Sequence, residues 1–228
     1  FILTNSFIDR IVDYSRIKVF KNAVVLPIIS VLQKTSKVKK DSLFFEPLED
    51  RLNLKASMNQ STFLSDDLHI INIDLDKQDL MLREKIENNS ITLESFATVK
   101  FGIKLYETGK GTPPQKADYA KSHLYEADHK VDDSYRPFLE GKDIQHYEIN
   151  WKNKWLKYGK NLAAPRDESL FTGNRILVRR IVGEKLICAF TKDNYVTSQL
   201  LQIVKPIDEN LVFFLLAILN SKLMAYYF

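Results

Sequence analysis

Apolar positions in the first ninety residues predict strands and one helix. The segments RIVDYS (residues 10–15) and AVVLPIISVLQK (residues 23–34) are rich in β-branched residues, and the second is apolar almost throughout. Such a continuous run is typical of a strand that is buried on both faces. LHIINIDL (residues 68–75) predicts a further strand, and DKQDLMLREKIENN (residues 76–89) predicts a helix. Residues 42–65 give no consistent pattern.

From Thr92 onward, short apolar runs alternate with turn residues, which predicts several strands. These strands lie within residues 97–106, 136–151 (two strands joined by a turn at Gly141) and 174–206 (three strands). Residues 107–119 predict a long loop. The final segment, residues 208–228, predicts an apolar helix whose N-cap is Asp208 or Asn210.

The distribution of glycine separates these two parts of the chain. All seven glycines lie between residues 102 and 183. The first hundred residues therefore cannot hold a glycine-rich nucleotide loop. We expect an α+β chain with segments at 1–40 and 41–91, a strand-rich domain at 92–206 and a C-terminal helix at 207–228.

Composition narrows the class of protein. Hydrophobic residues make up 45% and charged residues 27%, as in ordinary soluble proteins, and no apolar run reaches the ~18 residues of a membrane span. One cysteine excludes an internal disulfide and suits a reducing cytoplasm, and with four histidines it makes no convincing zinc site. Because the chain starts at Phe1 and stops at Phe228 inside an apparent helix, we expect a piece of a longer cytoplasmic protein.

Positive charge is concentrated in one part of the chain. The net charge is +4, but residues 136–192 hold 12 Lys and Arg against 6 Asp and Glu, a surplus of +6, so the remainder sums to −2. A local surplus of this kind is expected when the partner is a polyanion. A solvated basic surface would give the same count.

Two stretches add groups that suit a nucleic acid. Lys110 lies between Gly109 and Gly111, so the backbone could approach a ligand closely while the lysine meets a phosphate; a mobile surface loop is the alternative. In WKNKWLKYGK (residues 151–160), lysines alternate with aromatic residues. This pattern suits a nucleic-acid strand, and equally a set of core aromatics with lysines in water.

Acidic residues near Gly141 raise one catalytic alternative. Asp132 and Asp133, followed by Glu140-x-Lys142, loosely match metal-dependent nucleases, in which carboxylates hold Mg²⁺ and a lysine steadies the attacking water. A glycine turn with exposed charges explains the same residues, and we favour it. The chain has no P-loop and no G-x-S-x-G motif.

Five segments follow one another in an order that resembles a known family. They are TLESFATVKFGIKLYETGKGTPPQ, YRPFLEGKDIQHYEINW, WLKYGKNLAAPRDESLF, NRILVRRIVGEKLICAF and FFLLAILNSKLMAYYF. The series resembles the C-terminal target-recognition region of TaqI-like adenine DNA methyltransferases, which include type IIG restriction-modification enzymes and phage-defence methylases. The resemblance covers about residues 92–228, and its most specific part is the Leu-Asn-Ser-Lys run at residues 219–222. Residues 6–34 are similar to the last strands of a Rossmann-like methyltransferase domain.

The resemblance implies a DNA-reading module cut from an enzyme, with no catalytic residue of its own. The family's Asn-Pro-Pro-aromatic motif and glycine-rich S-adenosylmethionine loop lie upstream, and GTPPQ has Thr112 and Gln115 in place of the asparagine and the aromatic residue. Neither cofactor nor metal is expected in this chain, while S-adenosylmethionine is implied for the parent. Double-stranded DNA and the upstream methyltransferase domain are the expected partners. Whether the parent also cleaves DNA is left open.

Basic side chains are the expected DNA contacts, since arginine and lysine meet phosphates and arginine also reads guanine. The candidates are Lys104, Lys110, Lys142, Lys152, Lys154, Arg175, Arg179, Arg180 and Lys192. Arg179 and Arg180 are neighbours in a strand, so they point to opposite faces. We expect Arg179, with Arg175, to face DNA, and Arg180 to be held by a buried carboxylate or to lie at the strand's end. A sheet edge or bulge would reverse this assignment.

Two other classes of function compete with a fused enzyme's recognition module. The chain could be the specificity subunit of a type I restriction system, for which a second recognition domain would be needed. It could also be a protein-interaction module that docks through the apolar final helix. Steep loss of DNA affinity with salt would distinguish DNA recognition from protein docking.

Overall fold

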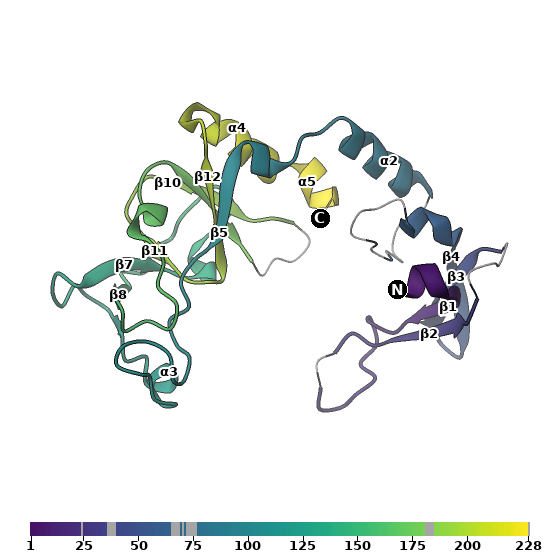
Figure 1. Cartoon of the computed structure of the whole chain (residues 1–228), viewed down its shortest axis with the longest axis horizontal. Coiled ribbons are helices and arrows are strands. Elements are labelled where there is room, and N and C mark those ends of the chain that lie inside the picture. The colour runs from purple at the N-terminus through teal and green to yellow at the C-terminus, as the bar shows by residue number, and fades with distance from the viewer. Residues whose placement is uncertain are drawn as a thin grey trace. The chain divides into compact units, whose positions relative to one another are not determined.

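The computed structural model describes residues 1–228 with the exception of 24, 36–39, 65–68, 70, 72–76, 181–184 and 228. The chain forms two compact units, Phe1–Asn89 and Ser90–Phe228 (Figure 1). The strand expected at residues 68–75 lies, apart from His69 and Ile71, outside the described residues.

The first unit is built on a four-stranded sheet in the order β2-β1-β3-β4. Its strands are β1 (Phe7–Asp13), β2 (Ile28–Gln33), β3 (Ser42–Leu48) and β4 (Arg51–Met58), and its helices are α1 (Ile2–Asn5), the 3₁₀ turn η1 (Gln60–Leu64) and α2 (Lys77–Asn88). Strand β1 runs parallel to β3 and antiparallel to β2. Ile8, Ile11, Phe44 and Phe63 form the centre of the core of this unit. The predicted helix at residues 76–89 is confirmed as α2.

Strand β2 was predicted, but its expected burial on both faces is wrong. All six of its residues are exposed, because β2 pairs only with β1 and lies at the edge of the sheet. The continuous apolar run in residues 23–34 therefore marks an edge strand of this unit.

The second unit contains two four-stranded sheets, with strand orders β10-β9-β12-β5 and β11-β7-β8-β6. The strands are β5 (Ala97–Phe101), β6 (Glu126–Ala127), β7 (Tyr135–Leu139), β8 (Trp155–Lys157), β9 (Arg175–Arg179), β10 (Cys188–Thr191), β11 (Val196–Thr197) and β12 (Leu201–Pro206). The helical segments are η2 (Leu93–Ser95), α3 (Tyr119–Ser122), η3 (Gly141–Asp143), η4 (Glu168–Phe171), η5 (Glu209–Leu211), α4 (Val212–Leu219) and α5 (Lys222–Tyr227). The α+β class, rich in strands and ending in helix, is thus confirmed. The strand expected after Gly141 is not formed; Ile144 and Ile149 make only an isolated bridge.

Strand β9 lies between two hydrophobic clusters. Its Ile176 and Val178 belong to a cluster that includes Leu215 of α4, and its Leu177 belongs to a second cluster that includes Phe138 of β7. Both faces of β9 are therefore covered, which explains why the first four of its five residues are buried.

The C-terminal segment was predicted as one helix, but it is divided at Asn220. Asp208 caps η5, since its side chain accepts a hydrogen bond from the Asn210 N–H, as predicted. The buried amide of Asn220 donates to the Cys188 carbonyl (3.0 Å) and accepts from the Cys188 N–H (3.1 Å). Asn220 thereby acts as a partner for the outer edge of β10, the edge strand of its sheet (Figure 1).

Candidate nucleic-acid interface

Arg175 lies in the core, although it was expected to face DNA. Its side chain is 0% exposed. The guanidinium donates to three backbone carbonyls, those of Gly173 (2.9 Å), Asp193 (2.5 Å) and Tyr195 (3.2 Å). Burial lowers the pKa of Arg175 to about 10, with the charge of Asp193 acting in the opposite direction, so the group stays protonated at neutral pH. The expectation is wrong because the strand face that carries Arg175 and Leu177 is covered by the second sheet's cluster.

Lys154 is held in an ion-pair cluster. Its ammonium pairs with the buried carboxylate of Glu126 and with Glu140 (3.2 Å). Burial alone would lower the pKa of Lys154, but these two carboxylates outweigh it and raise the pKa. Burial likewise opposes Lys142 and Lys154 at Glu140, whose pKa is nevertheless lowered. If Lys154 left this cluster, the buried carboxylate of Glu126 would lose its partner. Lys154 therefore serves the fold and is not available to DNA.

Most of the remaining candidate lysines lie on the surface. Lys104 pairs with Glu107 (2.7 Å), Lys142 pairs with Glu140 (3.0 Å) and Lys152 donates to Asn150 (3.0 Å). The Lys104–Glu107 pair, with side chains 40% and 43% exposed, is a weak surface pair that exchanges readily for a phosphate. Lys110 and Lys192 are also exposed.

Hydrogen bonds of the Gln115 side chain anchor the loop that carries Lys110. The buried Gln115 amide donates to the carbonyls of Leu105 (2.9 Å) and Asn161 (2.7 Å) and accepts from the Glu107 N–H (2.8 Å). A Cβ on Gly111 would overlap the Asn161 carbonyl, so the close backbone approach at Gly111 is to this chain itself. The side chain of Lys110 therefore projects from an anchored loop.

The aromatic residues of the WKNKWLKYGK stretch are anchors for the core. Trp151 and Tyr158 pack against the cluster that contains Phe138, and the Trp151 indole N–H donates to the Lys154 carbonyl (3.0 Å). Trp151 also lies edge-on to Trp155, with ring centroids 5.7 Å apart. Of the two interpretations offered by the sequence, core packing with lysines in water is the one observed for Trp151 and Lys152.

Arg180 is the more accessible of the two neighbouring arginines. It directly follows the last residue of β9 and is exposed, whereas Arg179 is half-buried. The guanidinium carbon of Arg180 lies 5.3 Å from the ring centroid of Phe101, the last residue of β5. Of the two environments predicted for Arg180, the strand's end is correct. The sequence did not point to Phe101, whose exposure at the end of an edge strand depends on the tertiary structure.

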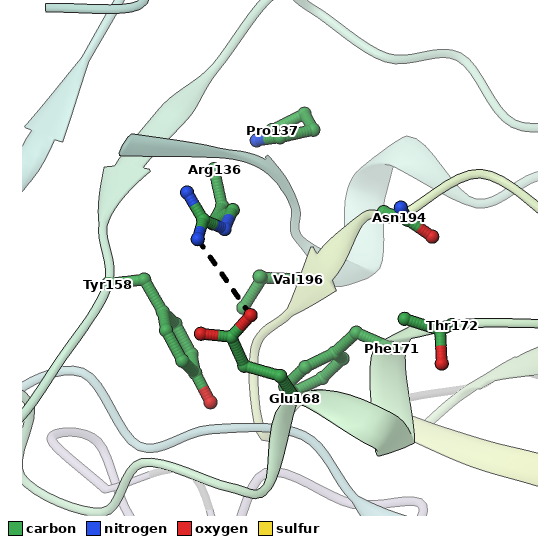
Figure 2. Close-up of a pocket in the computed structure, with 8 residues that line it drawn as sticks. All are labelled: Arg136, Pro137, Tyr158, Glu168, Phe171, Thr172, Asn194 and Val196. Atoms are coloured by element: carbon green, nitrogen blue, oxygen red, sulfur yellow. Dashed lines mark ion pairs between the residues drawn. The ribbon is translucent and has the colours of Figure 1, made fainter. Parts of the chain in front are cut away.

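A small pocket lies between η4 and the sheet that contains β7 and β11, and Figure 2 shows the Arg136 guanidinium and the Glu168 carboxylate facing each other across it. These two groups form an ion pair at 3.8 Å. The lining residues are Arg136, Pro137, Tyr158, Glu168, Phe171, Thr172, Asn194 and Val196. The volume of about 130 Å³ is below the roughly 300 Å³ of small-molecule sites, so the pocket does not suit a nucleotide.

The nuclease alternative is not supported by the position of its carboxylates. Asp133 and Glu140 lie at opposite ends of β7, and a strand's rise of ~3.3 Å per residue puts them about 20 Å apart. Asp132 instead accepts from the Ser134 N–H (2.7 Å), and Asp133 pairs with Lys130 (2.7 Å). Within the part of the chain that the structure describes, no three His, Cys, Asp or Glu side chains are grouped as metal ligands.

Comparison with known proteins confirms the resemblance over part of the chain. Residues 136–228 match the sequence profile of a family described as the TaqI-like C-terminal specificity domain. Among solved structures, the type IIL restriction-modification enzyme MmeI in complex with DNA is similar at a TM-score of 0.49 and 12% identity. That match covers 93% of this chain, which spans 31% of the length of MmeI. No curated protein sequence matches the chain. Among the described helices, none combines the length and apolar character needed to cross a bilayer.

Proposed function

We propose that this chain, whose residues 136–228 match the TaqI-like C-terminal specificity domain, is the DNA target-recognition module of an adenine-specific DNA methyltransferase. The parent protein acts in the cytoplasm in restriction-modification or phage defence, and its upstream methyltransferase domain is the module's partner. The observation that carries the proposal is the match of residues 136–228 to a specificity domain.

Binding of S-adenosylmethionine belongs to another part of the parent protein. The first glycine of this chain is Gly102, so residues 1–101 hold no glycine-rich cofactor loop. The GTPPQ loop does not suit catalysis either, because the Gln115 amide is engaged by backbone groups of the chain itself. We therefore assign neither methyl transfer nor cofactor binding to these residues.

Several of the predicted contacts are accessible in the structure, which supports duplex DNA as the partner. The exposed ones are Lys110, Lys142, Lys152, Arg180 and Lys192; Lys104 and Arg179 are half-buried, and Arg175 and Lys154 serve the fold. Those that pair with carboxylates do so at the surface, where exchange for a phosphate costs little. Side chains of this kind position a protein on the DNA backbone, and a few base contacts add specificity.

Salt-dependent DNA binding tests the proposal. The chain is titrated into a fluorescent duplex at salt concentrations from about 50 to about 200 mM, and log Kd is plotted against log salt concentration. Neutralisation of four to six phosphates predicts a slope of roughly 4 to 5 in magnitude, at about 0.9 per phosphate. Affinity that does not change with salt, or no binding at about 50 mM, would refute DNA recognition by this chain.

Protein docking is the second candidate, and the outer face of α4 favours it. Phe213 and Phe214 are 62% and 61% exposed, while Leu215 and Leu216 of the same helix are buried. Docking through such a surface would depend little on salt, so the same titration with a protein partner separates the two classes. A second recognition domain in the parent would instead indicate a type I specificity subunit.

A further inference from the structure

Two guanidinium groups converge on Phe101, the exposed last residue of edge strand β5. The Phe101 side chain is 42% exposed. Arg180 contacts the ring face, and Arg166 contacts the backbone of the same residue. Arg166 was not among the predicted candidates, because nothing in the local pattern APRDESLF (residues 164–171) distinguishes it from other surface cations.

Arg180 is oriented by both its backbone and its side chain. Its N–H donates to the Leu200 carbonyl (2.9 Å), which continues the pairing of β9 with β12 past Arg179. Gln202 of β12 pairs with Phe101 on one side and with Val178 on the other, so Phe101 and Arg180 lie on the same face of the sheet. The ring supports one side of the guanidinium and leaves its N–H edge in solvent.

Arg166 is held by hydrogen bonds to Phe101 and Tyr158. Its Nε donates to the Phe101 carbonyl (3.2 Å). Its own N–H donates to the Tyr158 hydroxyl (3.3 Å), which in turn donates to the Arg166 carbonyl. Tyr158 is itself packed edge-on against the buried ring of Phe171, with centroids 6.0 Å apart. The Nε bond fixes the side chain and leaves its two terminal nitrogens for a ligand.

Neither guanidinium is neutralised within the described part of the chain, where no carboxylate lies at ion-pair distance from Arg166 or Arg180. Both positive charges are held at the same residue, and an anion bound beside it is attracted to both. A phosphate matches the planar donor fork of arginine and binds it in two-point fashion.

We propose that Arg166, Phe101 and Arg180 form a clamp for one backbone phosphate of DNA; this rests on the proposed DNA-recognition function. Arg166 and Arg180 bind the phosphate oxygens, and Phe101 holds both arginines in place. Because Arg180 covers a face of the Phe101 ring, that face is not a platform for a base. The clamp sets the position of the protein on DNA and does not read sequence.

The test measures duplex binding by the 228-residue chain and its variants at several salt concentrations, with several unrelated sequences. Arg166→Ala and Arg180→Ala each weaken binding by about 10-fold for every sequence and lower the salt slope by about 0.9. Phe101→Ala keeps both charges, so it weakens binding by about 3-fold with little change in slope. Arg10→Ala is the control: it removes one exposed arginine of the other unit, paired there with Asp9 (3.0 Å), and leaves affinity unchanged.

The outcomes separate the clamp from the proposed function. Salt-dependent binding by the unchanged chain, with affinity and slope unaltered in both arginine variants, overturns the clamp and leaves DNA recognition standing. Loss confined to particular sequences also overturns it, because the arginines would then read bases. Absence of binding by the unchanged chain refutes DNA recognition, and the clamp with it. Thermal unfolding of each variant confirms that the fold is intact.

Discussion

Replacement of Asn220 by alanine tests the contact that divides the C-terminal helix. In the antiparallel pairing of β9 with β10, the Arg179 N–H donates to the Ile187 carbonyl, so the polar groups of the next residue, Cys188, point away from β9. Asn220 accepts from the Cys188 N–H and donates to its carbonyl. The carbonyl has a second donor, the Tyr147 N–H (2.9 Å). Asn220→Ala therefore leaves only the Cys188 N–H without a partner.

The expected loss of stability in Asn220→Ala follows because the Cys188 carbonyl keeps a second donor, whereas the Cys188 N–H loses its acceptor. The shared bond to the carbonyl contributes about 1 kcal/mol, and an unpaired N–H in a dry site costs about 1–3 kcal/mol. Water does not reach Cys188, which is 0% exposed. The free energy of unfolding should thus fall by roughly 2–4 kcal/mol.

Urea unfolding followed by tryptophan fluorescence measures this loss, because both tryptophans, Trp151 and Trp155, lie in the second unit. With a slope of about 2 kcal/mol per molar urea, the midpoint should fall by about 1–2 M. Ser221→Ala is the control: it removes only the hydroxyl that accepts from the Met224 N–H (3.1 Å), a cap contact of about 1 kcal/mol. A loss below about 0.5 kcal/mol for Asn220→Ala would refute the role given to Asn220.

Three further predictions use the same unfolding assay. Gly102→Ala should lower the free energy of unfolding by about 2 kcal/mol or more, because the added Cβ overlaps the backbone carbonyl of Ser198. An unchanged urea midpoint would contradict this close contact between Gly102 and Ser198. Arg175→Met should cost about 3 kcal/mol by leaving backbone carbonyls unpaired, and a stability equal to that of the unchanged chain would place Arg175 elsewhere. Burial opposes the effect of Lys142 and Lys154 on Glu140, but the pKa of Glu140 is still lowered. The stabilisation that its carboxylate gives to the folded state is therefore complete above the ordinary pKa of a glutamate and is lost as pH falls through the pKa in the folded state. Glu140→Gln should remove about 1 kcal/mol near neutral pH and flatten the acid side of the stability profile.

Local patterns were sufficient for the elements whose signals are local. Helix α2 is confirmed from its composition and ending residues, and β9, β10 and β12 lie within the run predicted to hold strands. Asp208 caps η5 as predicted, because a cap depends only on the next few residues. The family resemblance likewise depended on short segments in a fixed order, and it is confirmed for residues 136–228.

The sequence by itself determined where α2 and several of the strands form, while β3 and β4 gave no local signal and only the tertiary structure decided what each face meets. The alternation of side chains separates Arg175 from Arg180, but it does not say which face is covered. The second sheet covers the face that carries Arg175, and the exposed edge of β5 leaves Arg180 beside Phe101 in solvent. For the same reason the apolar residues of β2 proved exposed and Asn220 proved buried. Burial depends on contacts between residues far apart in the chain, such as Asn220 and Cys188, and no local periodicity encodes them.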